Sequence, residues 1–226
     1  MIERPDRSFF DRAYFEAQTR HSLPHTREVI YPLADRTARL LCRRFHPQRV
    51  LDLGCAKGFL VEALRAHGAT AVFGIDISAY AVSAATAEIR DRLVVGDAQA
   101  GLPIRSASCD LVTAVDVFEH LPQPEIALRE IRRILEASGV AYLKICHPRH
   151  PNACRDPSHV SVWPLARWRT AFRGAGFDCT RVYEAEFAPS AGRLGPVKAW
   201  VRRGREWAVI GTPADYKFLL WKSRHG

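Results

Sequence analysis

Asp52, Asp76, Asp97 and Asp116 each lie at or just beyond the end of a short apolar run. Aspartate is disfavoured in strands, so packing alone does not account for an acid at each of these places. Carboxylates gathered in this way can accept hydrogen bonds from the hydroxyl groups of a ligand. The spacing of these four acids is therefore the first indication of chemistry in this chain.

The turn 54–58, with the sequence Gly-Cys-Ala-Lys-Gly, directly follows the first of these runs. Gly54 and Gly58 carry no side chain, so backbone N–H groups of the turn can approach a ligand closely. A dinucleotide fingerprint, G-x-G-x-x-G, would need a third glycine in step, and this turn has none. The turn therefore predicts a ligand site of another kind than an NAD site.

An alternation of apolar runs and helical patterns positions these residues. Runs that read as strands occupy 49–53, 71–75, 93–95, 111–115 and 140–146. Helical patterns occupy 59–67, 80–89 and 124–135, and Ser138-Gly139 is expected to end the last of them. Such an alternation predicts a parallel sheet covered on both faces, with ligands bound at the carboxyl edge of the strands.

The two ends of the chain are less regular. Residues 8–46 have a helical pattern in which Pro32 predicts a kink or a restart. The segment 146–160 is rich in Pro, His and Arg, which predicts a loop, and loops at this edge commonly carry function. Beyond it we expect a helix at 164–173 and strands at 177–183 and 216–221.

Together these motifs resemble the class I S-adenosylmethionine (SAM)-dependent methyltransferases, over roughly residues 48–180. Glu119-His120-Leu121 matches the Glu-His-Leu signature of the small-molecule branch of that family. The resemblance implies an α/β, Rossmann-like fold with a seven-stranded, mostly parallel sheet and a reversed last strand. It also implies an N-terminal helical lid at 1–47 and a methyltransferase domain at 48–226 with a substrate-side insertion near 186–210.

The resemblance implies SAM as the cofactor and a role for each matching residue. Asp52 and the glycine turn would hold the methionine part, Asp76 the ribose hydroxyls, and Asp97 the adenine. The implied cofactor-binding residues are Asp52, Gly54, Cys55, Ala56, Gly58, Asp76, Ile77, Gly96, Asp97, Ala98 and Asp116. Ala56 stands where the family has its middle glycine, so we expect a negative φ at this position.

Methyl transfer to a hydroxyl group needs a base, and a histidine with a near-neutral pKa is the usual one, worth ~10²–10⁴-fold in rate. His159 is the first candidate and His147 the second, because both lie in the loop after the fifth strand; His120 is the third. Each of them also fits a structural role as a loop cap or surface histidine. The candidate acceptor-binding residues are Tyr14, His150, Arg149 and Arg155.

A metal site is the competing interpretation of the same region. Asp116, Glu119 and His120 place two carboxylates and an imidazole within one short turn, and a histidine from the later loop could complete the site. Similar constellations bind a divalent metal in some ubiquinone-pathway O-methyltransferases and small-RNA terminal 2′-O-methyltransferases, where the ion acts as a Lewis acid. Many methyltransferases with the Glu-His-Leu signature look metal-free, so we do not favour a metal site here. A second set contains residue types that can bind zinc, but their spacing matches no standard zinc finger: Cys146, His147, His150, Cys154 and His159.

The composition is that of a globular protein, with 226 residues and 47% hydrophobic residues. The 33 basic and 24 acidic residues give a net charge of +9, which suits an anionic partner or reflects solvated surface alone. Six scattered cysteines without a C-x-x-C pair predict reduced thiols. No apolar run is long enough to span a membrane, so we expect a cytoplasmic protein with no membrane partner.

These observations predict a SAM-dependent O-methyltransferase. Its acceptor would be a small metabolite or natural-product intermediate, and the basic charge suits an anionic one. The alternatives are ribose 2′-O-methylation of RNA, N-methylation of a small molecule, and a SAM-binding module without catalysis. The Asn-Pro-Pro-aromatic motif of methyltransferases acting on base amines is absent, since residues 116–119 read Asp-Val-Phe-Glu, which argues against methylation of DNA bases.

Overall fold

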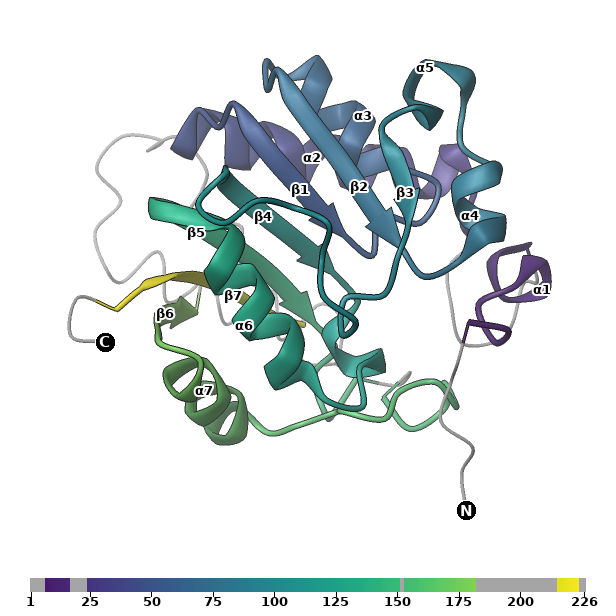
Figure 1. Ribbon diagram of the computed structural model, residues 1–226. Helices are drawn as coiled ribbons and strands as arrows, with labels where there is room; N and C mark the ends of the chain where they lie inside the picture. Colours follow the sequence, from purple (N-terminus) through teal and green to yellow (C-terminus); the bar gives the residue numbers. More distant parts are fainter. Residues whose placement is uncertain (1–6, 17–23, 151–152, 182–214, 224–226) are drawn as a thin grey trace, which may run out of the picture.

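The computed structural model describes residues 7–16, 24–150, 153–181 and 215–223 of the chain (Figure 1). Its helices are α1 Arg12–Glu16, α2 Arg27–Phe45, α3 Phe59–Ala66, α4 Ala79–Ser83, α5 Ala87–Arg90, the 3₁₀ turn η1 Phe118–His120, α6 Pro124–Ile134 and α7 Leu165–Gly174. Its strands are β1 Arg49–Leu53, β2 Ala71–Asp76, β3 Leu93–Val95, β4 Cys109–Val115, β5 Leu135–Ile145, β6 Phe177–Arg181 and β7 Tyr216–Lys222.

The described strands form a seven-stranded sheet in the order β3-β2-β1-β4-β5-β7-β6. Neighbours from β3 to β5 pair in parallel, whereas β7 runs antiparallel to both β5 and β6. The last strand is therefore reversed within a mostly parallel sheet, and the predicted fold class is confirmed. None of the helices in the described ranges is long and apolar enough to cross a membrane.

Each face of the sheet buries its own hydrophobic core, which follows from the alternation of side chains along a strand. Leu51 and Leu53 of β1 pack with α6 and α7, where Trp168 and Phe172 are fully buried. Val50, which precedes Leu51, points to the other face and packs with α2 and α3. In Figure 1, α6 and α7 accordingly lie in front of the sheet and α2 and α3 behind it.

Three local predictions are wrong in detail. The helix expected at 80–89 is two helices, α4 and α5, because Thr86 starts a new one as its N-cap. Helix α2 continues through Pro32, so the expected restart does not occur; Pro32 is the sixth residue of the helix, and its ring removes a single hydrogen bond near the N-terminal end. The strand β5 begins at Leu135, which pairs with Cys109, so Ser138-Gly139 lies within the strand and does not end α6.

The turn after β1 is built by hydrogen bonds to β2. The N–H groups of Gly54 and Cys55 both donate to the carbonyl oxygen of Ile75, at 2.7 and 3.1 Å. The N–H group of Ala56 donates to Asp76 Oδ2 at 2.7 Å. Gly54 has a φ of 72° and Ala56 a φ of 48°, so both residues adopt the left-handed backbone conformation. The negative φ expected at Ala56 is therefore wrong, because the bond to Asp76 holds the alanine in a conformation that usually favours glycine.

Gly54→Ala should destabilise the protein for two reasons: alanine is strained at this positive φ, and its Cβ would overlap a neighbouring side chain. A Cβ at Gly54 would lie 2.2 Å from Val117 Cγ2, whereas a Cβ at Gly68, which also has positive φ, would meet no atom within 4 Å. We expect Gly68→Ala to cost about 1 kcal/mol in the free energy of unfolding from backbone strain alone. Gly54→Ala should cost about 1–3 kcal/mol more, because of the added overlap.

Urea unfolding of the two variants, and of Gly54→Ala combined with Val117→Ala, measures these costs. The double variant should recover part of the loss by removing the overlapping methyl group. Equal losses for Gly54→Ala and Gly68→Ala would contradict the close approach of Val117.

Candidate functional site

A cavity of about 860 Å³ lies at the carboxyl edge of the sheet. Its described wall contains ten of the eleven predicted cofactor-binding residues, namely Asp52, Gly54, Cys55, Ala56, Asp76, Ile77, Gly96, Asp97, Ala98 and Asp116. The eleventh, Gly58, is outside this wall and starts α3 with a φ of 78°, where Ile89 and Leu93 pack close to its Cα. A volume of this size accommodates a nucleoside ligand together with a small second molecule.

Two buried carboxylates form the floor of the cavity. Asp52 is 3% exposed and accepts a hydrogen bond of 2.7 Å from the Thr113 hydroxyl. Burial raises the pKa of Asp52 to about 7. Asp76 is 7% exposed and accepts the N–H groups of Ala56 and Ser78, at 2.7 and 2.8 Å, and burial raises its pKa as well. Each carboxylate keeps lone pairs that a ligand in the cavity could use.

The segment around α1 covers one side of the cavity. Phe10, Tyr14 and Phe15 line the wall, and burial raises the pKa of the Tyr14 hydroxyl. The segment is tied to the end of β2 because the Ser78 hydroxyl donates to the carbonyl oxygen of Phe10 at 2.5 Å. The Tyr80 hydroxyl also donates to Glu16. In Figure 1, α1 lies beside α4, at the end of the sheet where β2 and β3 finish.

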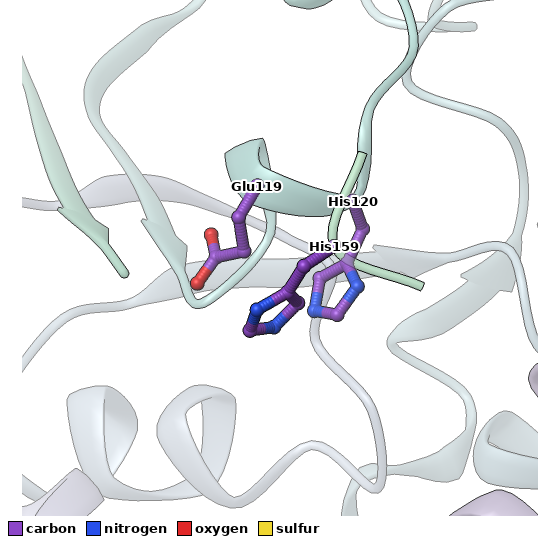
Figure 2. Close-up of side chains that lie close together, drawn as sticks. All are labelled: Glu119, His120 and His159. Carbon is purple, nitrogen blue, oxygen red and sulfur yellow. The ribbon is translucent and has the colours of Figure 1, made fainter. Parts of the chain in front are cut away.

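Glu119, His120 and His159 form a cluster in the wall, with a carboxylate oxygen and one nitrogen from each ring all within 4.8 Å of one another. Figure 2 shows His159 between the Glu119 carboxylate and the His120 ring. Glu119 is 1% exposed; its Oε1 accepts the N–H of Cys146 at 3.0 Å. Glu119 Oε2 and His159 Nδ1 are buried and have no hydrogen-bond partner in the described part of the chain.

Burial sets the charge of this cluster. It raises the pKa of Glu119, with the nearby Asp116 adding to the effect. It lowers the pKa of His120, to which the neighbouring His159 also contributes, and it lowers the pKa of His159 despite the opposing effect of Asp156. Both imidazoles are therefore neutral at pH 7, and each has a nitrogen lone pair able to accept a proton.

Asp116 forms an ion pair with Lys144 and is not part of this cluster. Lys144 Nζ lies 2.7 and 2.6 Å from its two carboxylate oxygens and 3.1 Å from Asp215 Oδ2. Asp116 has a φ of 54°, so this pairing fixes a strained position at the start of the loop after β4. The expected trio of Asp116, Glu119 and His120 is thus replaced in the structure by a trio in which His159 stands in place of Asp116.

The other predicted residues divide between the wall and its surroundings. His150 lines the cavity and lies with Cys146 and Asp215, one potential ligand atom from each within 4.8 Å of the others. His147, Arg149 and Arg155 are described by the structure but are not part of the wall. The His147 ring packs 4.5 Å from that of Tyr216, and its Nδ1 accepts the N–H of Arg149. The expected insertion near 186–210 lies outside the described residues.

The residues of the site that sequence reasoning missed include Lys144, His25, Asp156 and Ser158. Lys144 carried a signal, because a lysine within the apolar run of β5 has no packing reason to be there. His25 lines the cavity, and burial together with Lys57 lowers its pKa. Asp156 and Ser158 lie in the loop after β5, where spacing in the sequence gives no indication of partners.

The charge of the described wall suits a positively charged ligand. Seven carboxylate side chains and four lysine or arginine side chains line the cavity, although the chain as a whole carries a net charge of +9. SAM carries a sulfonium, an ammonium group and two ribose hydroxyls, all of which carboxylates recognise. The donor set at the carboxyl ends of β1, β2 and β3 therefore fits this cofactor.

Comparisons with known proteins agree with this geometry. Residues 51–143 match the model of a methyltransferase domain family. Over 100 residues the chain is 35% identical to the ubiquinone biosynthesis O-methyltransferase of Paracidovorax citrulli (strain AAC00-1), a match that covers 41% of each protein. The matched part therefore spans about two fifths of the length of that relative.

Two further relatives cover more of the chain. Over 193 residues it is 26% identical to the uncharacterized methyltransferase YcgJ of Bacillus subtilis (strain 168), which covers 77% of this chain and 69% of that protein. The crystal structure of a SAM-dependent methyltransferase from Archaeoglobus fulgidus superposes with a TM-score of 0.64 at 21% identity, covering 87% of this chain and 95% of the other. At this level of identity, the similarity to the Archaeoglobus fulgidus structure shows a shared fold.

Asp52→Asn should change how stability depends on pH. Because burial raises the pKa of Asp52 above its ordinary value, its contribution to stability is complete below pH 4 and is lost as the pH rises through about 7. The asparagine keeps an oxygen for the Thr113 hydroxyl but does not ionise. Without added ligand, it should gain stability over the unaltered protein at pH 8, on the order of 3–4 kcal/mol at most.

Thermal unfolding between pH 4 and 8 measures this difference, with Asp178→Asn, on the exposed side of β6, as the control. A constant difference between Asp52→Asn and the unaltered protein across this range would contradict the burial of an ionising carboxyl group.

Proposed function

We propose that this chain, which belongs to the class I SAM-dependent methyltransferases, transfers the methyl group of SAM to a hydroxyl oxygen of a small molecule. The observation that carries the proposal is the position of a neutral histidine, His159, in the wall that also contains Asp52, Asp76 and Asp97. A base and a cofactor site thus share one cavity. The match over 100 residues to an O-methyltransferase supports oxygen as the methylated atom.

SAM, when bound, supplies a methyl group activated by the positive sulfur. The contribution of the chain is to hold the two reactants in line, and such orientation can lower the barrier by up to ~7–11 kcal/mol. Asp76 would accept the ribose hydroxyls, Asp52 would face the methionine part across the glycine turn, and Asp97 would contact the adenine. These carboxylates also keep the positive charge of the cofactor favourable within a buried site.

His159 would accept the proton of the acceptor hydroxyl as the methyl group moves. Its lowered pKa keeps it unprotonated near pH 7, which a base requires. Glu119, whose pKa is raised by burial, lies beside it and would stabilise the resulting imidazolium once ionised. His120 is the alternative base, because its ring lies 4.7 Å from that of His159, measured between ring centroids.

The wall also bears on the acceptor. Phe10 and Tyr14 provide two aromatic rings 5.0 Å apart, which suits a planar or apolar acceptor. The anionic acceptor expected from Arg149 and Arg155 gains no support from the described wall, in which carboxylates are in excess. We therefore propose an uncharged or positively charged small molecule with a hydroxyl group.

A metal-assisted form of the same reaction is the second candidate. The specific observation is that Glu119 Oε2 and His159 Nδ1 are buried without a partner, and that both residues belong to a carboxylate–imidazole cluster of metal-ligand size. Glu119, His120 and His159 would hold a divalent cation. The cation would act as a Lewis acid on the acceptor oxygen and lower the pKa of its hydroxyl group.

Asp76→Ala should weaken SAM binding by more than tenfold, since it removes the acceptor for two ribose hydroxyls and for the N–H of Ala56. Isothermal titration calorimetry measures the affinity. Asp110→Ala is the matched control, because Asp110 also accepts two backbone N–H groups, those of Gln48 and Arg49, but lies at the opposite edge of the sheet. Unchanged affinity in a folded Asp76→Ala protein would refute the ribose assignment.

His159→Ala should lower kcat by about a hundredfold or more while leaving SAM affinity intact. His147→Ala is the control, since His147 lies outside the wall and should be nearly silent. Turnover is followed with isotope-labelled SAM and a panel of small hydroxyl-bearing acceptors, with and without EDTA. Survival of turnover in EDTA selects the metal-free form, and loss restored by added Mg²⁺ selects the second. Equal loss of turnover and SAM affinity in His159→Ala would argue for a structural role.

A further inference from the structure

We propose that Asp156 and Ser158 are positioning residues that hold His120 and His159 in opposite tautomers, so that each ring has its lone pair on the nitrogen turned away from them. The role of these tautomers in methyl transfer rests on the proposed function, whereas the tautomers themselves do not. Neither residue was singled out by the sequence, and neither contributes an atom to the Glu119–His120–His159 cluster.

The Ser158 hydroxyl decides the tautomer of His120. Ser158 is fully buried, and its Oγ lies 2.5 Å from Asp156 Oδ1 and 2.9 Å from His120 Nδ1. A hydroxyl has one hydrogen, and a carboxylate can only accept, so that hydrogen goes to Asp156. The serine oxygen then faces His120 with a lone pair, and His120 Nδ1 must carry the hydrogen. The lone pair of the neutral His120 ring is therefore on Nε2.

Asp156 acts directly on His159, whose ring also interacts with the backbone of Ala153. Its second oxygen, Oδ2, lies 3.8 Å from His159 Nε2, and the two side chains are about nine-tenths buried. A carboxylate at this distance attracts an N–H group and repels a nitrogen lone pair. The hydrogen therefore lies on Nε2, and the lone pair lies on Nδ1, which is the buried nitrogen without a partner.

One carboxylate thus serves two imidazoles. Through Oδ1 and Ser158 it orients His120, and through Oδ2 it orients His159, whose ring lies next to that of His120 in Figure 2. A base needs its lone pair towards the proton that it accepts, and the wrong tautomer cannot perform this step. With its hydrogen held on Nε2 by Asp156, His159 can accept a proton at Nδ1, and the same carboxylate stabilises the imidazolium that forms.

The two residues can be separated by variants that act on different rings. In Asp156→Asn, the amide oxygen remains the acceptor for Ser158, and the amide NH₂ group takes the place of Oδ2 beside His159. An N–H donor there favours a lone pair on Nε2, so His159 should change to the Nδ1–H tautomer while His120 keeps its own. In Ser158→Ala, His120 loses the group that fixes it and should become a mixture, while His159 stays unchanged.

Long-range ¹H–¹⁵N correlation spectra of the full chain with ¹⁵N-labelled histidine report both tautomers without any need for activity. We expect His120 with its hydrogen on Nδ1 and His159 with its hydrogen on Nε2 in the unaltered protein. His67, whose Nε2 lies 2.8 Å from Asp35 Oδ1 in a separate pair, is the internal control and should respond to Asp35→Asn alone.

Steady-state kinetics then test the functional part. Asp156→Asn should lower kcat by about a hundredfold with the KM for SAM unchanged, whereas Ser158→Ala should have the smaller effect. Finding His120 with its hydrogen on Nε2, or His159 insensitive to Asp156→Asn, would overturn the proposal. The expected tautomers in a protein that methylates no acceptor would instead leave the proposal standing and remove the proposed function. Should Asp156→Asn fail to fold, Ser158→Ala and its effect on His120 decide the outcome.

Discussion

The structure of the site depends on the burial of carboxylates at the open edge of the sheet. Asp76 binds the N–H groups of Ala56 and Ser78 and so joins the turn after β1 to the start of α4. Ser78 in turn holds the covering segment through the carbonyl oxygen of Phe10. A carboxylate buried in this way is costly unless backbone donors or a ligand compensate it. The geometry of the turn and of the segment that covers the cavity both follow from that compensation.

The same constraint operates at the other end of the cavity. Glu119 is buried with one oxygen bonded to the Cys146 N–H and the other without a partner in the described chain. Its neighbours, His120 and His159, are neutral, because burial disfavours their charged forms. Positive charge is therefore scarce there in the resting protein, and a proton, a cation or the cofactor's sulfonium would be favoured. The proposed methyl transfer would use this electrostatic condition.

Much of the fold follows from local patterns in the sequence. The apolar runs predicted the strands from β1 to β4, and the position of each acid at a strand end predicted that Asp52, Asp76 and Asp97 would meet at one edge. Details that depend on tertiary contacts did not follow. The sign of φ at Ala56 depends on a hydrogen bond to β2, and the start of β5 at Leu135 depends on pairing with Cys109. Likewise, His147 and His159 both lie in the loop after β5, so the sequence does not show which of them faces the cavity. In the structure, His147 packs against Tyr216 and His159 lines the cavity wall.

The most direct test of the account is the binding of SAM and of its demethylated product to the unaltered protein, measured by calorimetry near pH 8. The buried acids predict that both bind one per chain. They also predict that SAM binds more tightly, because it carries the additional positive charge of the sulfonium. Absence of binding by both molecules would contradict the assignment of these carboxylates, and with it the methyltransferase function.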